Sequence, residues 1–178
     1  VTGQRHWGER PEGGKDFVYH ARVVENNFDW EKSHFLNHPF EDLVIYEMHV
    51  RGFTRDASSG VKAPGTFEGL REKIPYLKEL GVTALYLNPI FYAQSCHKYD
   101  CLDYFHVDPH FGGDQALADL SKALHENGMK LILDISINHT GTAHRWFNRD
   151  GLYFEKTEGA YNNPNSVERS YYFFEPDN

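Results

Sequence analysis

Residues 66–87 read TFEGLREKIPYLKELGVTALYL, and the fold follows from this stretch. Apolar residues recur in its first part at helical spacing, which predicts a helix with one buried stripe, namely Phe67, Leu70, Ile74, Leu77 and Leu80. Thr66 can cap that helix, Pro75 should kink or restart it, and Gly81 should end it in a left-handed conformation. The apolar run 82–87 then follows, which is typical of a parallel strand covered on both faces.

The same order recurs in residues 114–135, DQALADLSKALHENGMKLILDI. Asp114 can cap a second helix, Gly128 should end it, and 129–135 is expected to form another buried strand. Upstream, the β-rich run 42–50 predicts a first strand. Strands that alternate with helices indicate a parallel sheet, either open and doubly wound or part of a closed barrel. In both cases functional residues lie beyond the carboxyl ends of the strands.

Composition narrows the functional classes. The chain has 178 residues, a net charge of −8 and 40% hydrophobic residues, which fits one folded domain and excludes disorder. It has no apolar run long enough to span a bilayer and no apolar signal core at its start, so a soluble, cytoplasmic protein is expected, without a membrane partner. An acidic balance without a Lys/Arg cluster argues against nucleic acid.

Several common sites are missing from the sequence. It contains neither a glycine-rich phosphate loop nor a Gly-x-Ser-x-Gly elbow, which argues against nucleotide binding and serine-hydrolase chemistry. Cys96 and Cys101 lack the paired ligands of a zinc site, so we interpret them as ordinary thiols. A small disulfide-bridged loop in an oxidising compartment is the alternative.

Two segments could carry chemistry. Residues 92–104 combine two acids, a histidine and three tyrosines, a mixture that suits sugar recognition and equally a solvated surface loop. In 134–140, Asp134 could be a catalytic carboxylate, but an acid bonded to backbone or Arg within the sheet is favoured. His139 could act as a general base, a metal ligand or a donor to a substrate hydroxyl.

These residues also carry a family resemblance. The stretch 42–142 resembles the N-terminal part of the α-amylase superfamily of glycoside hydrolases, which share a (β/α)₈ barrel with a domain B inserted after strand three. The run Asp134-Ile-Ser-Ile-Asn138-His139 resembles the first signature of the superfamily. From about residue 88 the chain is similar to neopullulanases and cyclomaltodextrinases, on the motifs His97-Lys98-Tyr99-Asp100, Asp103-Tyr104 and Asp108-Pro-His-Phe-Gly112. The earlier stretches 26–30 and 44–54 are similar to isoamylases and glycogen-debranching enzymes.

The resemblance implies an α/β fold made of the first three strands of a TIM (β/α)₈ barrel and the start of domain B. The expected division is an irregular approach segment over 1–41, the partial barrel over 42–140 and domain B from 141 to 178. It also implies that Tyr99 stacks on a sugar and that His97 and His139 bond its hydroxyls, with Asp100 supporting the subsite. Asp134 would be a structural acid, and Asn138 corresponds to a residue that ligates calcium in many α-amylases; no other cofactor is implied.

The function implied is retaining hydrolysis of α-1,4 or α-1,6 bonds in an α-glucan or maltooligosaccharide. The three catalytic carboxylates of the family follow strands four, five and seven, outside the matching segment, so we expect the chain by itself to be inactive. The remaining barrel portion or a second copy of the chain is the expected protein partner, since a partial barrel leaves sheet edges open. The alternatives are a non-catalytic glucan-binding or assembly module and an engineered half-barrel chimera.

Overall fold

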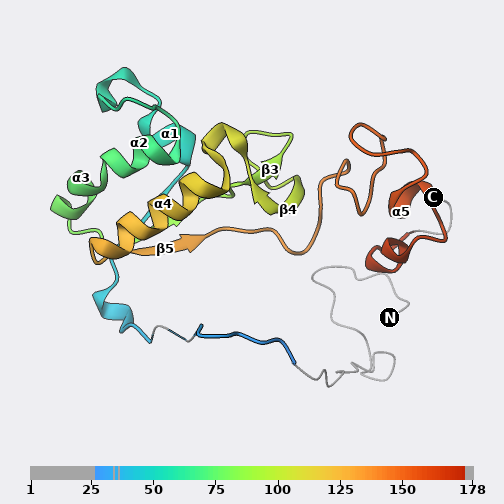
Figure 1. Ribbon diagram of the computed structural model, residues 1–178, viewed down its shortest axis with the longest axis horizontal. Helices are drawn as coiled ribbons and strands as arrows, with labels where there is room; N and C mark the ends of the chain where they lie inside the picture. Colours follow the sequence, from blue (N-terminus) through green and yellow to red (C-terminus); the bar gives the residue numbers. More distant parts are fainter. Residues whose placement is uncertain (1–26, 34, 36, 175–178) are drawn as a thin grey trace, which may run out of the picture. The chain divides into compact units, whose positions relative to one another are not determined.

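The computed structural model describes residues 27–33, 35 and 37–174 (Figure 1). The chain divides into two compact units, 1–37 and 38–178. In the described part of the first unit, the rings of Phe28 and Trp30 meet edge to face, 4.8 Å apart. Most of the predicted irregular segment 1–41 lies outside the described residues. The candidate functional site is built entirely by the second unit.

The second unit alternates strands with helices, as the sequence predicts. Its strands are β1 (Ile45–Met48), β2 (Ala84–Leu87), β3 (Phe91–Ala93), β4 (Cys101–Val107) and β5 (Lys130–Leu133). Its α-helices are α1 (Val50–Thr54), α2 (Phe67–Glu72), α3 (Ile74–Glu79), α4 (Gly113–Glu126) and α5 (Gly159–Asn162). Short 3₁₀ turns cover Phe40–Asp42, Ala57–Ser59, Pro109–Phe111 and Val167–Tyr171.

The three predicted strands form one parallel sheet in the order β1-β2-β5. Tyr86 stands opposite Glu47 on one side and Ile132 on the other. The first strand is shorter than predicted, because His49 caps a new helix: its Nδ1 accepts a hydrogen bond from the Gly52 N–H, and α1 follows at once. Strand β5 is also shorter and only half-buried, which corrects the predicted buried strand 129–135.

Helices α2, α3 and α4 pack on one face of this sheet (Figure 1). Thr66 caps α2 as predicted, and Gly81 takes the left-handed conformation with φ 79°. Pro75 lies in the first turn of α3, which restarts after the break at Lys73. The stripe of α4 buries Leu120 and Leu124 completely. The prediction that Asp114 caps α4 is wrong, because Gly112 occupies the N-cap position.

An antiparallel hairpin replaces the expected irregular loop between the second and third parallel strands. Strands β3 and β4 pair with two shifts of register, so Phe91 faces Val107 and Ala93 faces Cys101. The free thiols of Cys96 and Cys101 are respectively exposed and buried. Asp114, the residue expected to cap α4, instead accepts the Val107 N–H at 2.7 Å and so joins the hairpin to the helix.

After β5 the chain returns to the hairpin. The Gly141 N–H donates to the carbonyl of Cys101 at 2.9 Å, and a Cβ at this position would collide with the backbone of Asp100. Aromatic residues gather beyond this point: Trp146 lies 4.6 Å from the ring of His144 and 5.8 Å from that of Tyr171. Among the described residues, no helix has the length and apolar character needed to cross a membrane.

Candidate functional site

The centre of the candidate site is a contact between the hairpin turn and the end of β5. The Tyr99 hydroxyl donates a hydrogen bond of 2.6 Å to Oδ2 of Asp134, although the two residues are 35 positions apart in sequence. This bond, together with local burial and the Asp134 charge, raises the pKa of Tyr99 to about 12. Tyr99 is 40% exposed, so part of it is accessible to a ligand.

Asp134 lies one residue past β5, and its backbone N–H still donates to Leu87 at 2.9 Å. The favoured expectation, an acid bonded to backbone or Arg, is wrong about the partner, because the side chain accepts from a tyrosine hydroxyl. That contact fixes the orientation of the Tyr99 ring, so Asp134 positions a neighbouring side chain. Its structural role stays a prediction of the resemblance.

His97 and Tyr99 form an aromatic pair. Their rings stack 5.9 Å apart at an interplanar angle of 27°, and Nδ1 of His97 accepts the Tyr99 N–H at 3.1 Å. That bond leaves the exposed Nε2 as the protonated nitrogen of a neutral ring, available to donate to a hydroxyl. A flat ring beside such a donor is the combination that binds the face and the rim of a sugar.

His139 approaches the same turn from the other side. Its Nε2 donates to the carbonyl of Tyr99 at 3.0 Å, and the Ser136 hydroxyl donates to that carbonyl over the same distance. Nδ1 lies 3.0 Å from the side-chain oxygen Oδ1 of Asn138, which is also an acceptor. A neutral ring carries a single N–H, so it can donate to the Tyr99 carbonyl or to Asn138 Oδ1, but not to both at once. The geometry thus brings together three of the predicted residues, Tyr99, His97 and His139, around one turn.

Asp100 faces away from this cluster. Its carboxylate accepts the Ser95 N–H at 3.1 Å and also the Ser95 hydroxyl, which closes the turn on itself. These bonds make Asp100 part of what holds the shape of the turn. Its direct part in the subsite remains a prediction.

The environment of Asn138 does not fit a calcium site within the described residues. Calcium takes six to eight oxygen ligands, several of them usually carboxylates. In the residues that the structure describes, no group of three or more His, Cys, Asp and Glu side chains is placed to hold a metal ion. The Asn138 amide contacts only its neighbour His139 among the hydrogen bonds of the described chain, so calcium binding here has no structural support.

Two further residues near the site were missed by the sequence analysis. Tyr86 and Glu47 stand side by side on neighbouring strands, and burial followed by the charges of Asp134 and Glu47 raises the pKa of Tyr86. Both residues lie within runs that look like uniform strand-forming sequence, so no local signal marks them. The pattern that could have identified them is the alternation of side chains along each strand, which places Glu47 and Tyr86 on the sheet face away from the helices.

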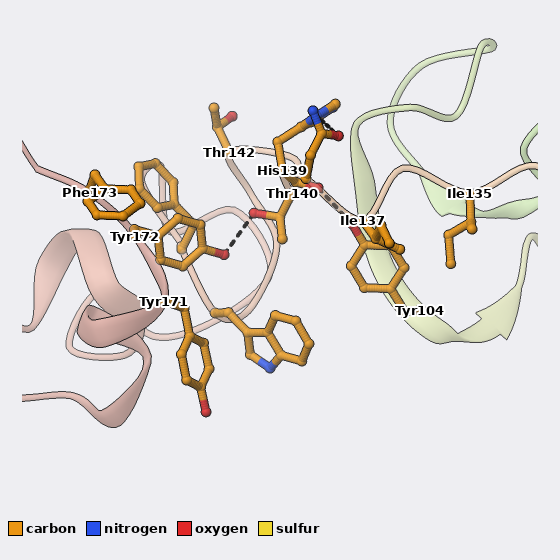
Figure 2. A pocket seen from close by; sticks show the side chains of 12 residues that line it. Tyr104, Ile135, Ile137, His139, Thr140, Thr142, Tyr171, Tyr172 and Phe173 are labelled. Atoms are coloured by element: carbon orange, nitrogen blue, oxygen red, sulfur yellow. Dashed lines mark hydrogen bonds between the residues drawn. The ribbon is translucent and has the colours of Figure 1, made fainter. Parts of the chain in front are cut away.

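Tyr104 links the hairpin to the segment after β5. Its hydroxyl lies 2.8 Å from the Ser136 carbonyl and 2.7 Å from the His139 carbonyl, so its one proton is shared between two acceptors. The ring also lines an aromatic pocket of about 820 Å³ (Figure 2). The other lining residues are Ile135, Ile137, Asn138, His139, Thr140, Thr142, Trp146, Phe147, Tyr171, Tyr172 and Phe173. Inside it, the hydroxyls of Thr140 and Tyr172 are 2.8 Å apart.

Comparison with known proteins gives this geometry a context. Residues 28–178 match the family model described as alpha amylase, catalytic domain. The chain is 34% identical over 148 residues to isoamylase 1 of Arabidopsis thaliana, covering 65% of this chain and 18% of the relative. It is 49% identical over 77 residues to the cyclomaltodextrinase of Thermoanaerobacter pseudethanolicus, covering 43% of this chain and 13% of the relative.

A solved structure supports the same relationship. The α-amylase from H. orenii superimposes with a TM-score of 0.61 and 32% identity, over 74% of this chain and 26% of that one. The chain spans between 13% and 26% of the length of the curated relatives described by the first four matches. Both kinds of relative anticipated from the motifs, isoamylase and cyclomaltodextrinase, are among them.

Proposed function

The chain belongs to the α-amylase family of glycoside hydrolases, and on that premise we propose that its hairpin turn and the end of β5 bind one sugar of an α-glucan or maltooligosaccharide. As part of a complete enzyme, this surface would hold the substrate for hydrolysis of α-1,4 or α-1,6 bonds with retention. Names of relatives such as cyclomaltodextrinase agree with a substrate of this class.

The convergence of Tyr99, His97 and His139 carries the proposal. Two stacked rings offer an apolar platform, and Asp134 fixes the tilt of one of them through a 2.6 Å hydrogen bond. Such a preset platform suits a neutral, flat-faced ligand, because little side-chain freedom has to be lost on binding. Nε2 of His97, whose Nδ1 accepts the Tyr99 N–H, supplies a donor for a sugar hydroxyl.

The proposed role of these residues is binding, without bond cleavage. A retaining mechanism requires two carboxyl groups on either side of the scissile bond, one as nucleophile and one as acid and base. Asp134 is engaged by a tyrosine hydroxyl, and the family places its catalytic acids after later strands of the barrel. A polypeptide of only these 178 residues is therefore proposed to bind glucan and to leave it intact.

Calorimetric titration with maltoheptaose tests the proposal. Tyr99→Ala removes the platform and should weaken binding by about tenfold or more, as expected for an aromatic anchor. Tyr153→Ala is the matched control, since Tyr153 is a similarly exposed tyrosine in a different part of the chain. Equal affinities for both variants and the wild type, or no heat of binding at all, would reject the site.

A second role, assembly with another polypeptide, is favoured by exposed apolar residues at the end of β5 and just after it. Leu133, Ile135 and Ile137 are 37%, 42% and 85% exposed, and in the described residues the outer edge of β5 pairs with no strand. Apolar strand edges of this kind readily pair with another chain. The proposed occupant is the remaining barrel portion, and native mass spectrometry would detect it; a second copy would appear as a dimer, and a monomer of unchanged mass would exclude both.

A further inference from the structure

The turn that presents Tyr99 and His97 has an unusual residue at its centre. Lys98 adopts a left-handed conformation with φ 65°, a region that glycine occupies easily and that a lysine side chain disfavours. It is also only 7% exposed, whereas lysine is among the residues least often buried. Two unfavourable features at one position indicate that a specific contact holds it.

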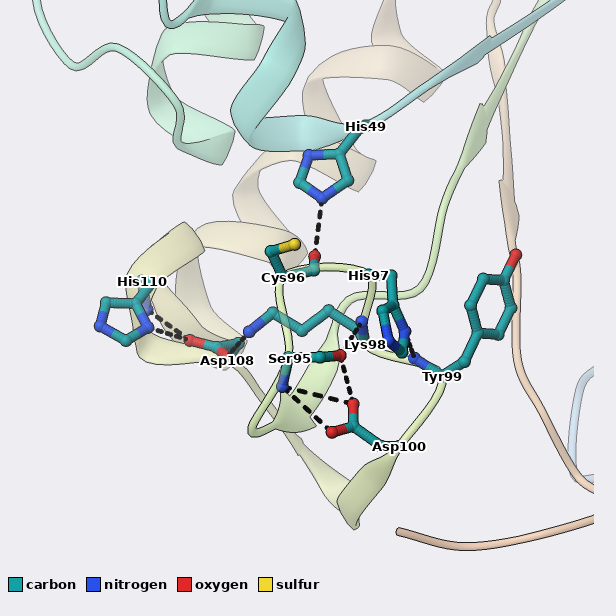
Figure 3. A network of polar contacts seen from close by, with 9 residues as sticks. All are labelled: His49, Ser95, Cys96, His97, Lys98, Tyr99, Asp100, Asp108 and His110. Atoms are coloured by element: carbon teal, nitrogen blue, oxygen red, sulfur yellow. Dashed lines mark hydrogen bonds and ion pairs between the residues drawn. The ribbon is translucent and has the colours of Figure 1, made fainter.

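That contact is an ion pair with Asp108. The Lys98 ammonium meets Oδ2 of Asp108, a carboxylate with no exposed surface (Figure 3). The ammonium also lies 5.5 Å from the centre of the Phe111 ring. The other oxygen, Oδ1, accepts the His110 N–H at 2.8 Å. A buried carboxylate needs such partners, because a charge without them is strongly destabilised in the interior.

Asp108 is itself fixed to the core. Its backbone N–H donates to the carbonyl of Ile90, a fully buried residue, at 2.9 Å. Burial acts to raise the pKa of Asp108, but the hydrogen bonds from Lys98 and His110 and the Lys98 charge outweigh it and lower that pKa below its usual value. The carboxylate is thus an ionised, immobile anchor.

The rings of His97 and Tyr99 lie on the side of the turn away from Asp108. In Figure 3 the Lys98 side chain runs toward Asp108, whereas the side chains of His97 and Tyr99 lie on the opposite side of the turn. The Lys98 N–H donates to the Ser95 hydroxyl at 3.1 Å, and Nε2 of His49 donates to the Cys96 carbonyl at 3.0 Å. These contacts hold the ends of the turn, and the ion pair holds its middle.

We propose that Lys98 is a positioning residue for the sugar platform: its ion pair with Asp108 keeps the turn in the left-handed conformation that stacks His97 against Tyr99. The inference rests on the proposed function only for its effect on glucan affinity. Its effect on the ring geometry can be tested without any sugar. Lys98 itself touches no ligand in this scheme.

Three variants of the 178-residue chain separate positioning from folding. Lys98→Met removes the ammonium and leaves the buried Asp108 carboxylate with His110 as its remaining partner, so both stability and ring geometry should suffer. The double variant Lys98→Met with Asp108→Asn removes both charges, which should restore much of the stability without restoring the anchor. Lys98→Gly has no ammonium but tolerates the left-handed backbone, so it should keep part of the stacking.

The primary measurement is the nuclear Overhauser effect between the ring protons of His97 and Tyr99, whose centroids are 5.9 Å apart. We expect this signal in the wild type, its loss in Lys98→Met and in the double variant, and partial retention in Lys98→Gly. Maltoheptaose affinity should fall in parallel, by about tenfold in the folded double variant.

The possible outcomes distinguish the two proposals. If the double variant is as stable as the wild type and keeps both the ring contact and the affinity, Lys98 does not position the platform and the inference is overturned. Should Lys98→Met fail to fold, the double variant and Lys98→Gly still decide the question. A wild type that shows the ring contact but binds no maltoheptaose would reject the proposed function alone, since the positioning is then judged by the rings.

Discussion

The two faces of the β1-β2-β5 sheet differ in what they contribute. On the helix-covered face, Met48, Leu85 and Leu87 are at most 5% exposed and join the buried cluster beneath α2, α3 and α4. On the opposite face, Ile45 is 45% exposed and Glu47 is exposed, while Tyr86 is half-buried beside Asp134. The closed face supplies most of the stability, and the open face leads to the candidate site.

This contrast follows from what each face packs against. Aliphatic side chains that are covered by helices gain free energy from removal from water, and a change of even one methylene is felt there. Side chains on the open face keep contact with solvent, so acids and hydroxyls can stand among them without a large desolvation penalty. A sheet can therefore hold polar chemistry on one side because the other side secures the fold.

The largest expected effect tests that difference directly. Leu85→Ala should lower the free energy of unfolding by about 3 kcal/mol, because it opens a cavity in the covered face. Ile45→Ala, on the open face, should cost about 1 kcal/mol or less, since that side chain is already 45% exposed. Urea unfolding of both variants measures the two values. Similar losses would mean that the open face is covered in solution.

In the aromatic segment after β5, as on the helix-covered face of the sheet, a buried charge should lower the stability of the fold. His144 is 4% exposed, and its Nδ1 accepts the Trp146 N–H at 3.1 Å, so the neutral ring is the one that fits. Burial lowers the pKa of His144 to about 4, against a small opposing effect of Asp103.

Because the folded state disfavours protonation of His144, stability is fully present above pH 6.5 and is lost as the pH falls toward 4. The loss at pH 5 should be about 2 kcal/mol. Thermal or urea unfolding between pH 7 and 5 measures it, and His144→Gln should reduce the slope. A slope unchanged by that substitution would assign the pH dependence to other groups.

A smaller effect is expected at the join between the hairpin and α4. Asp114→Ala removes the acceptor of the Val107 N–H and should cost about 1 kcal/mol. Asp119→Ala on the same helix is the control, because Asp119 accepts a hydrogen bond from the exposed Gln115 side chain, four residues away on the same helix. The free energy of unfolding of this control should stay within about 0.5 kcal/mol of the wild-type value. If both variants behave alike, the hairpin is held without this bond.

The smallest expected effect is the loss, at high pH, of the hydrogen bond between Tyr99 and Asp134. Hydrogen bonding to Asp134, followed by burial, raises the pKa of Tyr99 to about 12, so the contribution of this contact is complete below pH 10 and is lost as the pH rises toward 12. Asp134→Asn should return the pKa of Tyr99 toward 10. Titration of ¹³C-labelled tyrosine by NMR resolves the individual rings. A Tyr99 titration near 10 in the wild type would show that the contact does not form.

Local sequence was sufficient for the helix and strand repeats. The stripe over Phe67, Leu70, Ile74 and Leu77, the restart at Pro75 and the left-handed Gly81 depend on neighbours within a few residues, and they were confirmed. The fifth predicted member of the stripe, Leu80, is 51% exposed, so the prediction was wrong at the end of the helix. Other predictions failed because a side chain or strand found a partner outside its own helix or strand pattern. Asp114 bonds to Val107 of the hairpin, seven residues earlier, and the strand pair β3 and β4 brings Phe91 against Val107.

The candidate site shows the same division. Tyr99, His97, Asp100 and His139 were identified from motifs, but their arrangement was not. That Asp134 holds the hydroxyl of Tyr99, and that Lys98 turns away toward Asp108, depends on contacts across 35 and 10 residues respectively. The aromatic pocket behind Tyr104 likewise combines segments that the sequence separates.

By itself, then, the sequence determined the alternation of helices and parallel strands, the family and the set of polar residues at the strand ends, because periodicity, glycine positions and motifs are local properties of a chain. Only the tertiary structure decided which face of the sheet stays open, which turn residue is buried, and which acid meets which hydroxyl. These depend on the directions of side chains after packing, and the chain acquires those directions only when distant segments meet.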